Sequence, residues 1–408
     1  MKKSGIIISA SVLATVFAVN FTACKKENQQ SNTPGILIQE PNLKAEDNKY
    51  LEKHGVNNDL AVLGRVLFYD KNLSVNNQVS CGSCHKQEFA FADNVKVNKG
   101  FNGIDLKRNS PSIQGLRGFG NDNSTDFNSN TGGFNPPTET SMPTKDNQTD
   151  LLLFWDGRQN SLADMVLNPV LNHNEMNIPD FETLINKINS ISYYPELFNK
   201  AFGSSEVTKE KIAYALQGFI ACLNTDKDTG KNTNFNSEPF EDNFSPVLIT
   251  STLTGIEEEG RKLFHNKYNC AKCHDSNPQD PGEYGAVTSP SQMFNIGLDE
   301  VYTDKGLGAL TKKQGDQGLF KVPTLKNISV TGPYMHDGRF NNLGEVIDHY
   351  SHNIKPNNNL SPLFRNFDGT PKKLNILPAE KSALIAFLNT LKDEDFLTSP
   401  MYSDPFKK

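Results

Sequence analysis

The sequence of 408 residues is poor in cysteine and tryptophan and carries no basic cluster. It contains six cysteines and a single tryptophan, and its 47 acidic residues outnumber its 41 Lys and Arg residues, giving a formal net charge of −6. An acidic chain without a basic cluster is a poor ligand for nucleic acid. Beyond the N-terminal region, no segment is long and apolar enough to cross a membrane. These absences exclude a nucleic-acid partner and a membrane-spanning core.

The N-terminus, "MKKSGIIISASVLATVFAVNFTAC", has two lysines, a short apolar run and small residues before Cys24. This pattern is typical of a secretory signal. The three residues ending in Cys24 resemble a lipoprotein cleavage site, although Phe21 stands where leucine is usual. We expect a signal peptide over 1–23, a lipid anchor at Cys24 and a polar tether over 24–46, which predicts an extracytoplasmic, periplasmic protein. A plain signal peptide is the alternative.

Four of the cysteines form two pairs, and each pair is followed directly by a histidine. The first pentad, "CGSCH", contains Cys81, Cys84 and His85, and the second, "CAKCH", contains Cys270, Cys273 and His274. Export with paired cysteines would suggest disulfides, but disulfides do not explain the histidines. A zinc ribbon needs pairs close in sequence. The spacing predicts two covalently bound c-type haems, with the histidines as proximal iron ligands.

Helical spacing of apolar residues dominates the rest of the chain. It predicts helices over 58–67 and 212–223, a helix opened by a capping box at Thr254 and Glu257, and a last helix over 384–391. Cys222 is expected as a small core residue. No alternating β pattern is visible, so the predicted fold class is mainly α, with two cytochrome c-type haem domains.

The predicted domains follow the pentads. The N-terminal haem domain spans 47–238 and includes a polar surface loop over 118–150, and the C-terminal haem domain spans 239–408. The final segment of the chain is a candidate to pack back on the first domain.

Two further stretches carry a family resemblance. "FWDGRQNSLADMVLNPVLNHNEM" (154–176) and "FKVPTLKNISVTGPYMHDGRFNNLGEVIDHY" (320–350) resemble the bacterial di-haem cytochrome c peroxidases and MauG-type enzymes. The resemblance extends from about Leu60 to Leu391, excluding the 118–150 loop. It implies that one haem, the peroxidatic one, reacts with hydrogen peroxide and that the other transfers electrons.

The loop after the first pentad departs from the peroxidases of that family, which carry a histidine there. Here the loop, "ADNVKVNKGFNGIDLKRNSPS", contains none. We therefore expect the first haem to keep an open face for peroxide, as in the MauG-like branch. Lys96, Lys99 or a remote histidine remains an alternative ligand.

By the same resemblance, Glu175 in "NHNEM" matches the distal glutamate that moves a proton during O–O cleavage. Burial would raise its pKa toward neutrality. The alternative is a surface glutamate at a helix start. His173 is expected to face solvent. Pro169 matches a distal position, whereas Met165 stands where the MauG-like pattern has glutamine.

The second haem needs a sixth ligand if it only relays electrons. Its candidates are Met335, His336, His349, Tyr350 and His352. An apolar stripe of helical spacing over 343–350 includes Tyr350 and turns His349 about 100° away. The resemblance also implies tyrosine or methionine at this position, so Tyr350 is preferred and Met335 is next.

The resemblance gives roles to four more residues. Trp155 matches the tryptophan between the two haems and is predicted to relay electrons, with an ordinary core role as the alternative. Asn109, Thr331 and Pro333 match positions whose oxygens bind one calcium ion.

These residues predict a di-haem cytochrome c peroxidase that takes electrons from a small cytochrome c or copper protein. Two alternatives remain open. One is a MauG-like oxidase that oxidises a partner protein or other substrate, and the other is a di-haem electron carrier without turnover. Because relatives are often dimeric, a homodimer is a further expectation.

Overall fold

The computed structural model describes residues 58–116, 152–223, 253–274 and 293–407. The predictions for the signal peptide, lipid anchor and tether, the 118–150 loop and the boundary at 238/239 lie outside the described residues. The chain divides into two units, Met1–Pro34 and Gly35–Lys408, and every described residue belongs to the second.

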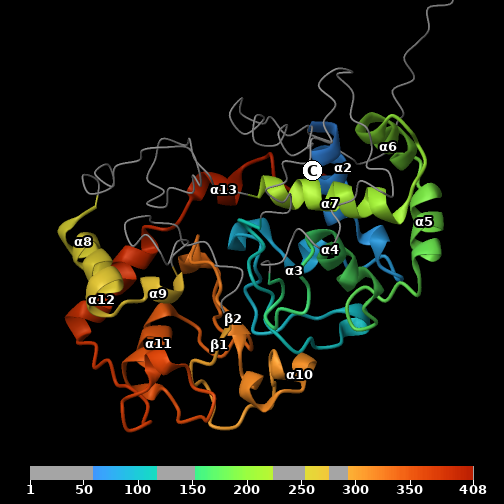
Figure 1. Ribbon diagram of the computed structural model, residues 1–408. Helices are drawn as coiled ribbons and strands as arrows, with labels where there is room; N and C mark the ends of the chain where they lie inside the picture. The colour runs from blue at the N-terminus through green and yellow to red at the C-terminus, as the bar shows by residue number, and fades with distance from the viewer. Residues whose placement is uncertain (1–57, 117–151, 224–252, 275–292, 408) are drawn as a thin grey trace, which may run out of the picture. The chain divides into compact units, whose positions relative to one another are not determined.

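Helices dominate the described residues, as predicted (Figure 1). The longer ones are α2 (Asn58–Tyr69), α4 (Leu162–Leu171), α5 (Phe181–Asn189), α6 (Tyr194–Phe202), α7 (Lys209–Cys222), α8 (Gly255–Lys262) and α12 (Pro378–Asn389). The shorter ones are α3 (Cys81–Cys84), α9 (Ala271–His274), α10 (Gly308–Thr311), α11 (Leu343–Asp348) and α13 (Glu394–Thr398). Two π-helical turns, Leu263–Lys267 and His349–Asn353, follow α8 and α11 directly. In this part of the chain, no helix has the length and hydropathy required to cross a bilayer.

The sequence pattern did not indicate the one small sheet of the described residues. It pairs β1 (Met293–Phe294) with β2 (Phe320–Lys321) in antiparallel register, with Met293 opposite Lys321. Each strand has only two residues, which is too short to show a period-2 pattern.

The helix before the first pentad packs closely on α7. In α2 the predicted apolar stripe is buried, and a Cβ atom added to Gly64 would lie 1.9 Å from the carbonyl oxygen of Ala215 and 2.8 Å from Phe219 Cβ. Only glycine allows two helix backbones to approach this closely. The α2–α7 crossing therefore depends on Gly64.

The same arrangement recurs before the second pentad. The α8 helix begins at the predicted capping box of Thr254 and Glu257. A Cβ atom on Gly260 would lie 1.9 Å from Ala383 O and 2.8 Å from Phe387 Cβ of α12. The two helix pairs thus share a glycine that faces an alanine and, four residues later, a phenylalanine.

Two hydrophobic cores follow from these crossings. The first gathers residues of α2, α4, α5, α6 and α7, and the second gathers residues of the π-helical turn Leu263–Lys267, α11 and α12. The C-terminal segment joins the first core, because Phe396 and Leu397 of α13 are buried in it. The hydroxyl of Tyr69 donates to Tyr402 O (2.8 Å), which ties the segment to α2.

Candidate functional site

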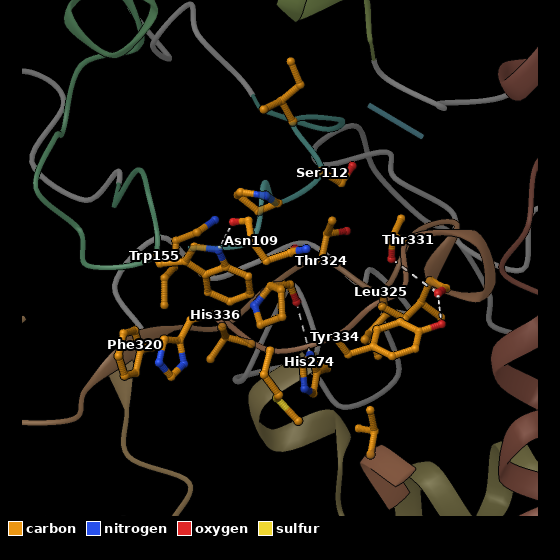
Figure 2. A pocket seen from close by; sticks show the side chains of 18 of the residues that line it. Asn109, Ser112, Trp155, His274, Phe320, Thr324, Leu325, Thr331, Tyr334 and His336 are labelled. Carbon is orange, nitrogen blue, oxygen red and sulfur yellow. Dashed lines mark hydrogen bonds between the residues drawn. The ribbon is translucent and has the colours of Figure 1, made fainter. Parts of the chain in front are cut away.

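A cavity of about 590 Å³ is lined by both pentads and mostly by apolar side chains. Figure 2 shows part of its wall, where Trp155, His274, Tyr334 and His336 lie around one space. Side chains 189 residues apart in the sequence, such as His85 and His274, therefore face a common cavity.

The first pentad forms the short helix α3, which begins at a capping box made by Ser80 and Ser83. Both thiols are free, and burial raises the pKa of Cys81 and of Cys84 to about 12. The His85 Nδ1 atom lies 2.8 Å from Phe91 O. Because a carbonyl oxygen only accepts hydrogen bonds, Nδ1 must carry the proton, which leaves Nε2 as the free metal-binding atom.

The second pentad repeats this arrangement. Its two thiols are free, and burial raises the pKa of Cys270 to about 12 and that of Cys273 to about 11. His274 Nδ1 lies 3.3 Å from Pro323 O, so its Nε2 is again the free nitrogen (Figure 2). Burial lowers the pKa of His274 to about 4, which keeps the imidazole neutral.

Glu175 follows the C-terminus of α4 and lines the cavity. Burial raises its pKa, while the positive charge of Arg158 and a hydrogen bond from Asn172 Nδ2 to Oε1 (2.8 Å) act in the opposite direction. Its charge also raises the pKa of the Cys84 thiol, which places the carboxylate near the first pentad. Glu175 is therefore a cavity residue after a helix, rather than a surface residue at a helix start.

The neighbours of Glu175 separate into two groups. Pro169 and Met165 of α4 line the cavity. His173 is exposed, as predicted.

The alternative ligands near the first pentad lie elsewhere. Neither Lys96 nor Lys99 lines the cavity. Lys99 pairs with Asp105 at 2.5 Å on the exposed surface, and Lys96 borders a separate open pocket.

Among the candidates for the sixth ligand at the second pentad, Met335, His336 and Tyr350 line the cavity, and His349 and His352 do not. Tyr350 lies in the π-helical turn after α11. Burial raises its pKa, and the charges of the Cys273 and Cys270 thiolates act in the same direction. His349 is buried, with Nε2 3.0 Å from Ile296 O. His349 thus does not line the cavity, and its ring packs edge to face against that of Tyr350, with the ring centres 5.3 Å apart.

Trp155 is held rigidly in the cavity wall. Its Nε1 donates to Asn109 O (2.9 Å), and its carbonyl oxygen accepts from the backbone N–H of Lys321 (2.8 Å) (Figure 2). The Asn109 N–H in turn donates to His336 O (2.8 Å). Trp155 is thus bonded to segments that belong to both halves of the described chain.

The predicted calcium ligands line the same cavity. Asn109 Nδ2 donates to Val95 O (3.0 Å), which leaves Oδ1 as its candidate ligand atom. Thr331 Oγ1 donates to Ile328 O (3.3 Å) and keeps its lone pairs for a cation. Since no group of three His, Cys, Asp or Glu residues forms a metal cluster in the described residues, a calcium ion here would depend on neutral oxygens and water.

Two charged residues of this region were missed by the sequence analysis. Arg108 bonds Asp156 at 2.6 Å and Asp304 at 2.7 Å and lies 5.8 Å from the centre of the Phe320 ring. Lys321 lines the cavity beside Trp155. Neither carries a local sequence signal, because Asp304, which pairs with Arg108, and Trp155, which accepts the backbone N–H of Lys321, lie far away in the chain.

Comparisons with known proteins agree with this geometry. Residues 58–237 match the family described as di-haem cytochrome c peroxidase. The chain is 28% identical over 339 residues to methylamine utilization protein MauG of Methylophilus methylotrophus, covering 81% of the chain and 82% of that protein. It is also 28% identical over 296 residues to cytochrome c551 peroxidase of Nitrosomonas europaea, covering 72% of each.

A similar solved structure is that of a MauG-like protein associated with microbial copper homeostasis. It matches with a TM-score of 0.66 and 26% identity, covering 91% of this chain and 98% of that one.

Proposed function

We propose that the chain is a member of the di-haem cytochrome c peroxidase and MauG family, and that it is an exported enzyme, lipid-anchored at Cys24, that reduces hydrogen peroxide. Peroxide takes up two electrons and two protons and leaves as two water molecules. The electrons come from a small cytochrome c or copper protein. The observation that carries the proposal is the single cavity shared by both pentads and Glu175.

The residues present fit two c-type haems. Each pentad offers two free thiols and a histidine whose Nδ1 is held by a carbonyl oxygen. The recurring glycine crossings before the pentads support one haem domain around each. When bound, the haem irons would supply the binding site for peroxide and the electron-transfer chemistry.

Glu175 is the proton carrier of this proposal. Asn172 fixes Oε1, so Oε2 is the atom left to accept a proton from peroxide and return it to the departing oxygen. The raised pKa makes the carboxylate a better base than an exposed glutamate, and the apolar wall keeps competing water away.

Trp155 and Tyr350 serve the electron path. The ring nitrogen of Trp155 is bonded to Asn109 and its carbonyl oxygen to Lys321. These two bonds hold the indole in one position between a segment near the first pentad and a segment near the second. Tyr350 is the proposed sixth ligand at the second pentad, supported by its place in the cavity beside Cys270 and Cys273. Asn109, Thr331 and Pro333 are the proposed calcium ligands.

The decisive experiment is peroxide consumption by the purified di-haem protein with reduced cytochrome c as donor. We expect one peroxide consumed for every two cytochromes oxidised, and a large loss of rate for Glu175→Gln. A protein that binds two haems but leaves peroxide untouched with every donor offered would be an electron carrier, which contradicts the proposal.

A MauG-like oxidase is the second candidate, because no histidine stands in the loop after the first pentad, and neither Lys96 nor Lys99 lines the cavity. In that case peroxide consumption would be coupled to oxidation of a partner protein rather than of cytochrome c. Tryptic mass spectrometry of the partner before and after peroxide distinguishes the two activities.

A further inference from the structure

Lys321 contributes a charge to the cavity wall that the proposed function does not use. It is the last residue of β2, opposite Met293, and its backbone N–H donates to Trp155 O at 2.8 Å. Its side chain lines the cavity. Lys321 therefore borders the cavity that the haems would occupy.

This ammonium group has no counter-charge within the described part of the chain. Burial lowers the pKa of Lys321 to about 8, and no nearby carboxylate acts against that shift. The neighbouring cation Arg108 differs, since it bonds the carboxylates of Asp156 and Asp304. A desolvated cation without a partner is costly, so the site suits an anion that the described residues do not supply.

The position of Lys321 indicates which anion this is. Pro323, two residues further on, provides the carbonyl oxygen that holds His274 Nδ1. Two residues of chain span at most about 7 Å, so Lys321 lies beside the backbone that positions the second proximal histidine. A haem carries two propionate carboxylates, and an ammonium ion is a strong charge-assisted donor to a carboxylate.

We propose that Lys321 binds a propionate carboxylate of the haem attached at the second pentad. The inference rests on the proposed di-haem content but not on peroxidase activity. The bond would fix the haem edge beside the Trp155 backbone. It would also place a positive charge near that iron, which favours the reduced, less positive state of the haem.

The test is a spectroelectrochemical titration of both haems in the full chain carrying Lys321→Met, Lys321→Arg or, as a matched surface control, Lys313→Met. We expect Lys321→Met to lower the midpoint potential of the haem on His274 and to leave the other haem unchanged. Lys321→Arg keeps the charge and should stay near the wild-type value, and Lys313→Met should match it. Lys321→Gln provides a second neutral variant if the methionine variant does not accumulate.

Redox-difference infrared spectra of protein with ¹³C-labelled propionates give a direct readout. The labelled carboxylate band should shift in Lys321→Met and not in Lys321→Arg. Unchanged potentials and bands in the neutral variants, or a shift confined to the haem on His85, would overturn this inference while leaving the proposed function intact. Purified protein without haem would overturn both.

Discussion

Glu175 is a buried carboxyl group, so replacing it should lower activity and raise the stability of the folded protein. Its folded-state pKa is raised, so the unfolded chain loses this proton at a lower pH than the folded protein does. Folding stability from this group therefore falls as pH rises from about 4.5 through the folded pKa. Glu175→Gln removes this penalty together with the proton carrier.

We accordingly predict that Glu175→Gln lowers peroxide turnover by roughly 10²- to 10⁴-fold while raising the thermal unfolding temperature at pH 7. The stability gain should disappear below about pH 4.5, where both states are protonated. Turnover against pH and calorimetry on the same samples provide the check. A variant that is less stable at pH 7 would show that the carboxylate serves as a structural anchor.

The proposed ligation of iron by Tyr350 at the second pentad can be tested by electron paramagnetic resonance. If its phenolate oxygen ligates the iron, Tyr350→Phe should convert the low-spin electron paramagnetic resonance signal of the ferric protein and leave a signal from the haem on His85 unchanged. Met335→Leu is the matched control in the same cavity and should leave both signals in place. The reverse result would move the ligand to Met335.

The close approach of α2 to α7 and of α8 to α12 predicts that glycine is required at each crossing. A methyl group on Gly64 or Gly260 would overlap the carbonyl oxygen of the facing helix, so Gly64→Ala and Gly260→Ala should each destabilise the protein by about 1–3 kcal/mol. Gly255→Ala in the same helix as Gly260 meets no atom within 4 Å and should be neutral or slightly stabilising. Urea unfolding of the three variants measures this contrast, and equal losses in all three would rule out the crossing as the cause.

The helices were predictable where their signals are local. The stripe of α2, the capping box of α8 and the spacing in α7 and α12 each lie within a few turns of chain, and each helix is present. Gly260 lies against Ala383 and Phe387, which are more than one hundred positions away in the chain. No local sequence pattern predicts this contact. The π turn at His349–Asn353 likewise departs from the 3.6-residue period on which the stripe was read.

The candidate site shows the same division. The pentads could be read from the sequence because haem attachment needs its residues side by side in the chain. Glu175 and Trp155 were found by family resemblance, and Tyr350 by helical periodicity together with that resemblance. All three line the cavity. Lys321 and Arg108 were not predicted, because a single Lys or Arg forms no sequence motif. Whether such a residue has a charged partner is known only once the fold is known.

At the scale of the whole molecule, Arg108 connects the surroundings of the two pentads. It bonds Asp156, next to Trp155, and Asp304, which lies beyond the second pentad in the chain. Arg108→Met leaves these carboxylates partly buried without their partner. We predict a loss of roughly 2 kcal/mol, below the 3–5 kcal/mol of fully buried pairs, because Asp304 is partly exposed and Asp156 keeps Arg158.

Besides this modest loss of stability, Arg108→Met should have an effect on electron transfer. The bonds of Arg108 hold the segment around Trp155 against that around Asp304, so their loss should slow electron transfer between the two haems while each haem keeps its own spectrum. Stopped-flow reduction after peroxide addition measures that rate. Lys99→Met breaks an exposed pair with Asp105 and should change neither rate nor stability measurably. If Arg108→Met is destabilised but transfers electrons at the wild-type rate, Arg108 supports the fold without positioning the electron path.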